Sequence, residues 1–279
     1  MSSALTETVA VERPRSVLIC HAGSRENLEG IAPWLASFTD LVGLVILHEK
    51  GTRLQSRIRN EIGRIGRLRF LDVIAFRLYY AAFLAREDNR WLDRALGSLA
   101  ARYGKIPSSV EVLTVADPNG PEVEQFLTRL QPDLMIARCK RILKERIFTI
   151  PRIGTFVLHP GICPEYRNAH GAFWALAKRD LENVGLTLLK IDRGVDTGPV
   201  YGYFSYNFDE VRESHIVIMT RVVLDNLDAI GCKLMDICRG AAVPIDTTGR
   251  RSAVWGQPWL SSYLRWKWAA RRTNERCIP

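Results

Sequence analysis

The feature that most constrains this chain is an apolar run, from Ile153 to Leu158, that ends in a histidine followed at once by proline. Proline has no backbone N–H and cannot donate to a sheet ladder, so we expect a buried strand that stops at His159. The loop after it contains further glycine and proline residues. This arrangement places an imidazole at the carboxyl end of a strand, where open α/β sheets bind their ligands.

A second polar turn, residues 192–199, contains Asp196 and separates two apolar runs at 184–191 and 200–204. The runs read as strands, so Asp196 would also lie on a loop at the rim of a sheet. A histidine and a carboxylate on neighbouring loops suit general acid–base chemistry on an acyl group. The sequence therefore predicts His159 and Asp196 as a catalytic pair.

Short apolar runs alternate with segments of helical periodicity along the chain. Residues 16–20 form an apolar run, and a tight turn and then an amphipathic segment follow it. This order of strand, turn and helix is how a doubly wound sheet begins. Further strand patterns occupy residues 41–47, 110–115 and 133–137. The order predicts an α/β fold, a Rossmann-like, mostly parallel twisted sheet with helices on both faces.

The composition is that of an ordinary globular protein, with 47% hydrophobic and 25% charged residues in 279. No apolar run approaches the ~18 residues of a transmembrane helix, and residues 1–15 lack the apolar core of a signal peptide. The six cysteines are scattered without a CxxC pair, which favours reduced thiols over a zinc site. We therefore expect a cytoplasmic protein with no transmembrane segment and no metal.

The net charge of +9 is concentrated in two segments. Residues 50–105 carry 13 basic and five acidic residues, with arginines alternating with leucine and isoleucine. This pattern predicts an arginine-rich helical insertion whose apolar face packs on the sheet or on a partner subunit; a membrane-surface anchor and a polyanion-binding face are the alternatives. The tryptophan-rich segment 255–272 either docks on the body or a partner, or stacks on nucleic-acid bases. A homodimer through either segment is possible.

These patterns divide the chain into three regions. We expect a disordered tail at residues 1–15 and a catalytic domain at 16–208, which contains the helical insertion at about 50–105. A helical C-terminal extension, 209–279, would pack on the same domain. Within it, apolar residues spaced by three or four from 213 to 238 predict one long amphipathic helix.

The motifs resemble those of the formyltransferase superfamily that uses formyl-tetrahydrofolate, which includes glycinamide ribonucleotide, methionyl-tRNA and amino-sugar formyltransferases. Its signature is a strand ending Asn-x-His-Pro-Ser, then a Leu-Pro-x-Tyr-Arg-Gly loop, then an Asp-x-Gly turn a little under forty residues later. The matching stretches here are 157–161, 163–168 and 196–198, and His159 and Asp196 are 37 positions apart. The resemblance is strong from about 133 to 203, diffuse from 16 to 48, and absent in the insertion and the C-terminal third.

The resemblance implies a folate-dependent transferase of one-carbon metabolism. It would pass a formyl group from 10-formyltetrahydrofolate to an amine of a small molecule, such as a sugar nucleotide, an amino acid or a natural-product intermediate. His159 would act as acid–base and oxyanion donor, and Asp196 would keep its ring charged. The formyl donor would lie against Arg138, Ile142, Leu143, Ile191, Asp192 and Val195. The predicted acceptor contacts are His21, Gly23, Tyr166, Arg167 and His170.

The sequence departs from the signature at two positions. Val157 stands where the family has its catalytic Asn, and Gly161 stands where it has Ser. Losing one oxyanion donor typically lowers a rate on the order of 10²–10³-fold, so Asn168 and His170 are candidate replacements.

Two other activities fit the departure at Val157: a formyltetrahydrofolate hydrolase, and a catalytically impaired protein of this fold that binds a polyanion or a membrane surface. A tRNA acceptor is disfavoured because the roughly 70 residues after the catalytic domain read as helices and not as an appended β-barrel.

Overall fold

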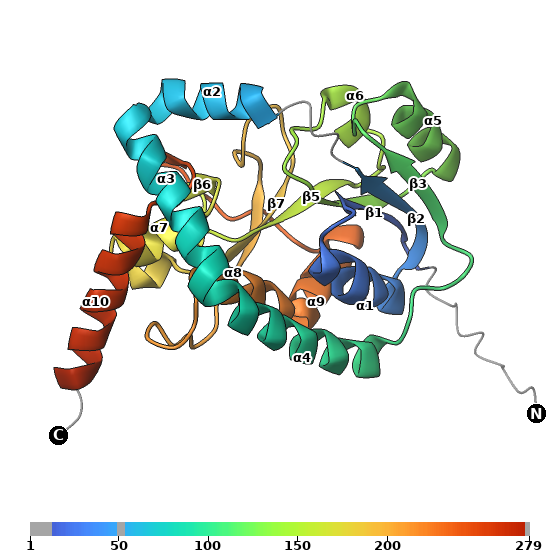
Figure 1. Cartoon of the computed structure of the whole chain (residues 1–279). Helices are drawn as coiled ribbons and strands as arrows, with labels where there is room; N and C mark the ends of the chain where they lie inside the picture. Colours follow the sequence, from blue (N-terminus) through green and yellow to red (C-terminus); the bar gives the residue numbers. More distant parts are fainter. Residues whose placement is uncertain (1–12, 49–53, 277–279) are drawn as a thin grey trace, which may run out of the picture.

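The computed structural model describes residues 13–48 and 54–276, and a seven-stranded sheet forms its centre (Figure 1). The strand order is β3–β2–β1–β4–β5–β7–β8. The first five strands in this order run parallel to one another. Strand β7 runs antiparallel to both of its neighbours, β5 and β8. The strand bounds are β1 (Arg15–His21), β2 (Asp40–Leu47), β3 (Glu111–Val115), β4 (Leu134–Arg138), β5 (Gly154–His159), β7 (Leu186–Lys190) and β8 (Val200–Phe204).

Helices cover both faces of this sheet. On one face the core joins the strands to α1 (Ala32–Phe38), α4 (Ala85–Tyr103), α8 (His215–Leu224) and α9 (Leu227–Cys238). On the other face it joins them to α5 (Pro121–Leu130) and α6 (Glu145–Phe148). Because both faces are buried, the parallel strands read as nearly continuous apolar runs. The predicted Rossmann-like fold is confirmed, and β5 ends at His159 as expected.

The insertion is helical, as predicted, but it is divided at Gly66. This glycine has φ 82°, a conformation that side-chain-bearing residues rarely adopt, so α2 (Leu54–Ile65) ends there and α3 (Arg67–Tyr79) begins. A π-helical turn, η3 (Tyr80–Leu84), joins α3 to α4 without a break in helical backbone angles. The resulting long helix crosses the front of the molecule in Figure 1.

The single long helix expected from residue 213 to 238 was wrong, because α8 and α9 are separate helices. The side-chain amide of Asn226 donates to the backbone carbonyls of Val222, at 2.8 Å, and Ser205, at 3.1 Å. A side chain that takes up backbone carbonyls competes with the helical ladder, which explains the break. The Ser214 side chain, which accepts from the N–H of Val217, sets the start of α8.

The C-terminal extension packs against the rest of the chain. Its helix α10 (Leu260–Arg276) contacts α3 and α7 (Gly171–Ala177), and Trp266 is 1% exposed within that contact. Trp255 and Trp259 are half-buried in the same cluster, whereas Trp268 is 62% exposed. The boundary at 208 stays a prediction, since α8 and α9 share one apolar cluster with the sheet. Most of the expected disordered tail lies outside the described residues.

Replacing Trp266 by alanine should lower the free energy of unfolding by about 3–5 kcal/mol, because it removes a buried aromatic side chain and leaves a cavity. Trp268→Ala is the matched control and should change it by no more than about 0.5 kcal/mol. Urea denaturation followed by circular dichroism measures both. A separate early transition in Trp266→Ala, with the main transition unchanged, would show that the extension unfolds independently.

Candidate active site

His159 closes strand β5 and is 5% exposed. Its Nε2 lies 2.8 Å from the backbone carbonyl of Tyr166, which can only accept, so Nε2 carries a proton. Its Nδ1 lies 3.5 Å from a carboxylate oxygen of Asp196. Nε2 is thus hydrogen-bonded to the following loop, and Nδ1 faces the Asp196 carboxylate at a distance that leaves room for a proton between them.

Asp196 is held in place from a neighbouring loop. Its Oδ2 accepts from the backbone N–H of Asn168 at 2.7 Å and is the same atom that faces His159. Its backbone has φ 52°, in the left-handed region that aspartate tolerates better than most residues. The predicted pairing of His159 and Asp196 in space is therefore present, and their catalytic roles stay predictions.

The loop after His159 is tied to the neighbouring strand β7 through a buried threonine. The Thr187 hydroxyl donates to the carbonyl of Gly161 at 2.6 Å and accepts from the N–H of Cys163 at 3.0 Å. Tyr166 is buried, and its hydroxyl donates to Asp180 at 2.7 Å. These bonds hold the Tyr166 carbonyl, which accepts the hydrogen bond from His159 Nε2. The sequence pattern alone did not single out Thr187.

The C-terminal extension also holds this loop. Strand β9 (Val254–Trp255) pairs in parallel with β6 (Arg167–Asn168), and the Trp255 indole donates to the carbonyl of Glu165 at 2.9 Å. Arg250 donates two hydrogen bonds, at 2.9 and 2.7 Å, to the Glu165 carboxylate. The extension is therefore part of the site's support, and no local sequence signal connected it to the loop.

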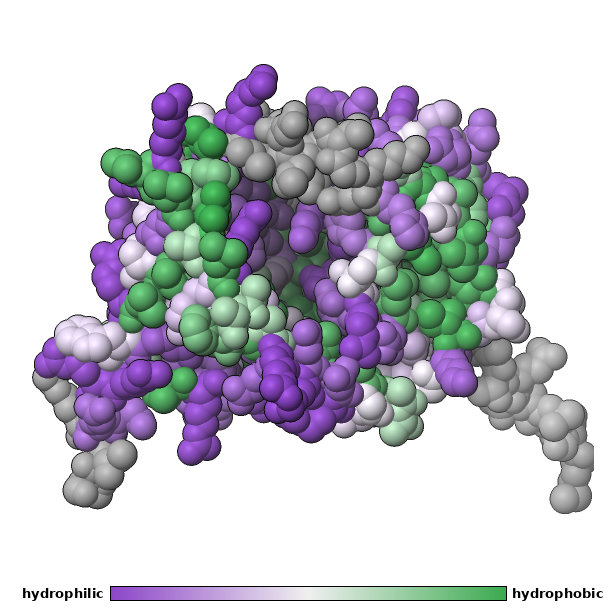
Figure 2. Space-filling view, in the orientation of Figure 1, coloured by the Kyte–Doolittle hydropathy of each residue, from purple (hydrophilic) through white to green (hydrophobic). Residues whose placement is uncertain are grey.

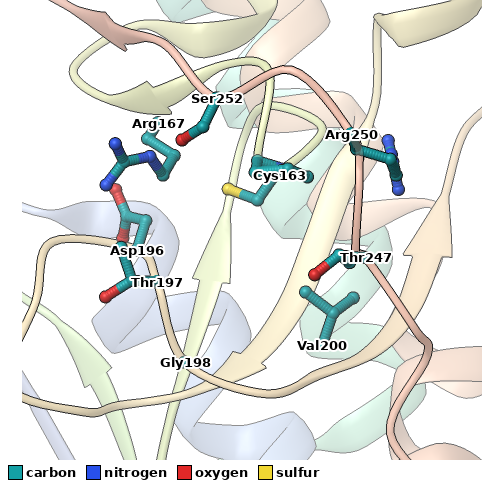
Figure 3. A pocket seen from close by; sticks show the side chains of 10 residues that line it. Cys163, Arg167, Asp196, Thr197, Gly198, Val200, Thr247, Arg250 and Ser252 are labelled. Carbon is teal, nitrogen blue, oxygen red and sulfur yellow. The ribbon is translucent and has the colours of Figure 1, made fainter.

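A cavity of about 240 Å³ opens beside Asp196 (Figure 3). Asp196 and Arg167 stand on one side of it, Arg250 and Thr247 on the other, and the Cys163 sulfur lies between them. Burial raises the pKa of the Cys163 thiol to about 12. This thiol stays protonated near neutral pH and is not a nucleophile, so the polar groups around the cavity define its chemistry.

Asn168 and His170, the candidate replacement donors, differ in their surroundings. The Asn168 side-chain amide donates to the carbonyl of Trp255 at 2.6 Å, so it is directed to the C-terminal strand. The His170 Nδ1 is buried without a partner. Burial first, then the charges of Lys140 and Arg77, lower the pKa of His170 to about 4. A neutral imidazole can still donate one proton, and the His170 Nδ1 is unbonded among the described residues, whereas the Asn168 amide already donates to Trp255.

The residues predicted to hold the formyl donor line the carboxyl end of the sheet in different ways. The Arg138 guanidinium is turned inward, donating to Asn27 at 3.0 Å and to the carbonyl of Leu158 at 2.5 Å, and burial lowers its pKa. Ile142 is 69% exposed, whereas Leu143 is buried. Ile191 and Val195 are half-buried. The apolar members thus form a partly open wall, while Arg138 links the end of β4 to β5 and to the helical turn η1 (Glu26–Ile31) that follows β1.

Asp192 stabilises the turn that carries Asp196. Its carboxylate accepts from the backbone N–H of Gly194 at 2.9 Å and from the Thr197 hydroxyl at 2.7 Å. These bonds are local turn chemistry of the kind that aspartate supplies. Asp192 was predicted to contact the formyl donor, but its carboxylate oxygens are used in hydrogen bonds that support the turn.

The predicted acceptor contacts on the first strand lie at the same rim. His21 Nε2 accepts from the backbone N–H of Lys140 at 3.0 Å, which links the loops after β1 and β4. Gly23 is exposed, and a Cβ there would meet nothing within 4 Å. Arg167 donates to the carbonyl of Val195 at 3.0 Å, and its buried Nε has no partner. His21 and Lys140 thus meet because β1 and β4 are parallel, whereas Arg167 meets Val195 through the loops after β5 and β7.

Val157 shares the face of β5 with His159, two residues away. Its side chain is half-buried and packs in apolar clusters with Ile191 and Leu189. Within the described part of the chain, no group of three or more His, Cys, Asp or Glu side chains is arranged to hold a metal ion. The polar groups that surround this end of β5 are His159, Asp196 and the loop groups bonded to them.

Residues 93–222 match the protein family described as formyl transferase. This part of the chain is similar to the formyl transferase domain. The match ends within α8, beyond the boundary that we expected at 208. The matched residues include His159, Asp196 and the loop between them, so the geometry described above lies within the segment that is similar to formyl transferases.

Two relatives by sequence are methionyl-tRNA formyltransferases. That of Dehalococcoides mccartyi (strain CBDB1) is 34% identical over 119 residues, which is 42% of this chain and 36% of that protein. That of Parabacteroides distasonis is 32% identical over 158 residues, 51% of this chain and 44% of that protein. The aligned segments span less than half of each relative.

Solved structures of the superfamily share the fold at low sequence identity. Glycinamide ribonucleotide transformylase 1 from Symbiobacterium toebii has a TM-score of 0.54 at 15% identity, covering 91% of this chain and all of that one. A sugar N-formyltransferase from Shewanella sp FDAARGOS_354 has a TM-score of 0.51 at 12% identity, covering 87% and 76%. These similarities support the fold class.

Stability should fall as the pH is lowered from 7 towards 4. Burial holds the pKa of His170 at about 4 and that of His215 well below its ordinary value, whereas both titrate near 6.5 in an unfolded chain. In that window the unfolded chain binds protons that the folded chain does not, so the free energy of unfolding decreases. Each histidine contributes up to about 1.4 kcal/mol per pH unit.

The variant His215→Phe keeps a ring beside Phe76, Phe173 and Tyr263 but cannot be protonated. Its free energy of unfolding in urea should depend less steeply on pH than that of the unmodified chain below pH 6.5. Above pH 7.5 the two curves should run parallel, which is the internal control. Parallel curves over the whole range would contradict the prediction.

Proposed function

We propose that this protein transfers a formyl group from 10-formyltetrahydrofolate to the amine of a small molecule. The observation that carries the proposal is the 3.5 Å approach of His159 Nδ1 to Asp196 at the rim of the sheet, within the segment that is similar to formyl transferases. Attack of an amine on a formyl carbon produces an oxyanion and requires a proton to leave the nitrogen. A histidine–carboxylate pair suits both demands.

In this mechanism each group of the pair has one task. His159, protonated on Nε2 and bonded to the Tyr166 carbonyl, presents Nδ1 to the reacting centre. Nδ1 accepts the proton that the attacking amine loses, and in the charged ring it becomes a hydrogen-bond donor to the developing oxyanion. When the adduct collapses, the bond from the formyl carbon to the folate nitrogen breaks and the same proton passes to that leaving nitrogen. Asp196 stabilises the imidazolium through its charge, since its Oδ2 already faces Nδ1.

The donor, when bound, supplies the activated formyl carbon. Leu143, Ile191 and Val195 offer apolar surface on the two loops next to the pair, and the exposed Ile142 would lose contact with water on binding a flat ring. This partly open wall fits an aromatic ligand. Arg138 would act indirectly in this proposal, by linking the ends of β4 and β5 to the helical turn η1.

Lys140 and Arg77 favour an acceptor that carries negative charge. Both cations lie close enough to His170 to help lower its pKa, and neither pairs with a carboxylate of the described residues. A sugar nucleotide or an amino acid offers an amine and an anionic group on one molecule. The methionyl-tRNA formyltransferase relatives make methionyl-tRNA a necessary member of any acceptor panel.

Substituting either member of the pair should abolish most formyl transfer. The test incubates the purified protein with 10-formyltetrahydrofolate and a panel of amino-sugar nucleotides, amino acids and methionyl-tRNA. We expect His159→Ala and Asp196→Asn to lower kcat/KM on the order of 10²–10⁴-fold, the usual contribution of a positioned acid–base group. Asp209→Asn is the matched control for the loss of one carboxylate.

Loss of 10-formyltetrahydrofolate that depends on Asp196 but occurs without any amine would show that the protein hydrolyses the donor and does not transfer its formyl group. Absence of any His159-dependent loss of donor with every acceptor would contradict an enzymatic role.

Installing an amide at position 157 should raise the rate. Position 157 shares its strand face with His159, so an Asn side chain there can reach the same reacting centre. One oxyanion donor is worth on the order of 10²–10³ in kcat, and Val157→Asn should recover much of it. Val157→Leu, which adds no donor, is the control. An unchanged kcat in Val157→Asn would mean that another group, with His170 the first candidate, already fills this role.

A further inference from the structure

The helical insertion presents an apolar stripe to solvent along α3. Leu68, Leu71, Ile74 and Leu78 follow one another at intervals of three or four residues and are between 39% and 84% exposed. The opposite side of the same helix is buried through Phe76. Figure 2 shows apolar side chains gathered over α3. A contiguous exposed apolar surface of this kind marks a site of interaction.

The stripe continues beyond α3 as a row of arginines. Arg86, Arg90 and Arg94 are exposed and lie four residues apart on α4. The π-helical turn η3 holds one residue more than an α-helical turn, so Leu78 and Arg86, eight residues apart, are two turns apart on the same side. One helical face is thus apolar in its first half and cationic in its second.

The described part of the chain does not neutralise these arginines. No ion pair joins any of the three to a carboxylate of residues 13–48 or 54–276. Glu87 is the one acidic residue beside them in a shallow surface depression that Phe83 also lines. Elsewhere some exposed arginines are paired, such as Arg25 with Asp93, and others, such as Arg239 and Arg251, have no carboxylate partner among the described residues. The three on α4 differ in forming one row on one side of a helix. The unpaired row therefore offers its charge to something outside the chain.

We propose that the outer face of α3, η3 and α4 binds the surface of an anionic phospholipid bilayer. The leucines would enter the boundary between headgroups and acyl chains, and the arginines would contact the lipid phosphates. Among the described residues no helix is long and apolar enough to cross a bilayer. The proposed contact accordingly lies in the plane of the interface.

Two other occupants fit this face less well. A nucleic acid would satisfy Arg86, Arg90 and Arg94 but offers no hydrocarbon to cover Leu71 and Leu78. A second copy of this chain could cover the leucines, yet it would bring the same unpaired arginines and no compensating carboxylates. A bilayer of acidic lipids complements both halves of the helix at once.

This binding does not depend on the proposed chemistry, although it would affect it. Arg77, on the same helix, lies close enough to His170 to lower its pKa, so the helix borders the candidate site. Docking would hold that edge of the molecule beside the lipid surface. An acceptor presented from the membrane would then reach the site without crossing bulk water.

The test is flotation of the full-length protein with vesicles of phosphatidylcholine alone or of phosphatidylcholine and phosphatidylglycerol in a 3:1 ratio. We expect binding to the anionic vesicles that weakens as salt is raised from 50 to 300 mM, and little binding to the neutral ones. Leu71→Ser/Leu78→Ser should lower the partition coefficient at least tenfold. Arg86→Gln/Arg90→Gln/Arg94→Gln should lower it on the order of 10²-fold.

Matched controls lie away from this helix. Val112→Ser/Val243→Ser removes two exposed apolar side chains, and Arg212→Gln/Arg239→Gln/Arg251→Gln removes three exposed charges; both should bind as the unmodified chain does. Urea midpoints verify that every variant is folded. No binding to anionic vesicles at 50 mM salt would overturn the proposal. So would a dimer in light scattering that Leu71→Ser/Leu78→Ser dissociates, if vesicles do not bind.

Discussion

The hydrogen bond from His159 Nε2 to the Tyr166 carbonyl is the contact on which the site's geometry depends. It fixes the ring plane, and with it the direction of Nδ1 towards Asp196. That carbonyl is itself held, because Thr187 ties the first part of the loop to β7 and the Arg250–Glu165 pair ties the middle to the C-terminal extension. The ring is thus positioned by three separate parts of the chain.

The C-terminal extension therefore belongs to the site as well as to the fold. Burying Trp266 and pairing β9 with β6 make the extension and the loop 160–168 parts of one packed unit. A catalytic pair gains from such support because small displacements of a proton acceptor cost rate. The formyl transferase family match ends at residue 222, so the contacts from Arg250 and Trp255 lie beyond it.

Much of the fold, and the meeting of His159 with Asp196, could be predicted because both depend on local signals. A buried strand followed by proline fixes where β5 ends. The route of the Asp196 loop was not predicted: β7 is antiparallel to β5, with Lys190 beside Phe156, so the loop leaves the sheet towards the start of β5 and returns to His159. The support by Arg250 could not be predicted, since it joins residues 85 positions apart with no local pattern. The break at Asn226 was missed because helical periodicity alone does not reveal a side chain that competes for backbone carbonyls.

The two departures from the family signature are connected through the His159 ring. A Cβ on Gly161 would stand 2.9 Å from His159 Nε2 and 2.7 Å from the Tyr166 carbonyl, so a serine there would displace one or the other. Without that side chain the ring can donate directly to the loop. Val157, on the same strand face, adds only apolar contact, which leaves Nδ1 as the ring atom open to chemistry. If His159 acts as proposed, glycine at 161 and valine at 157 direct its chemistry to the side of the ring that faces Asp196.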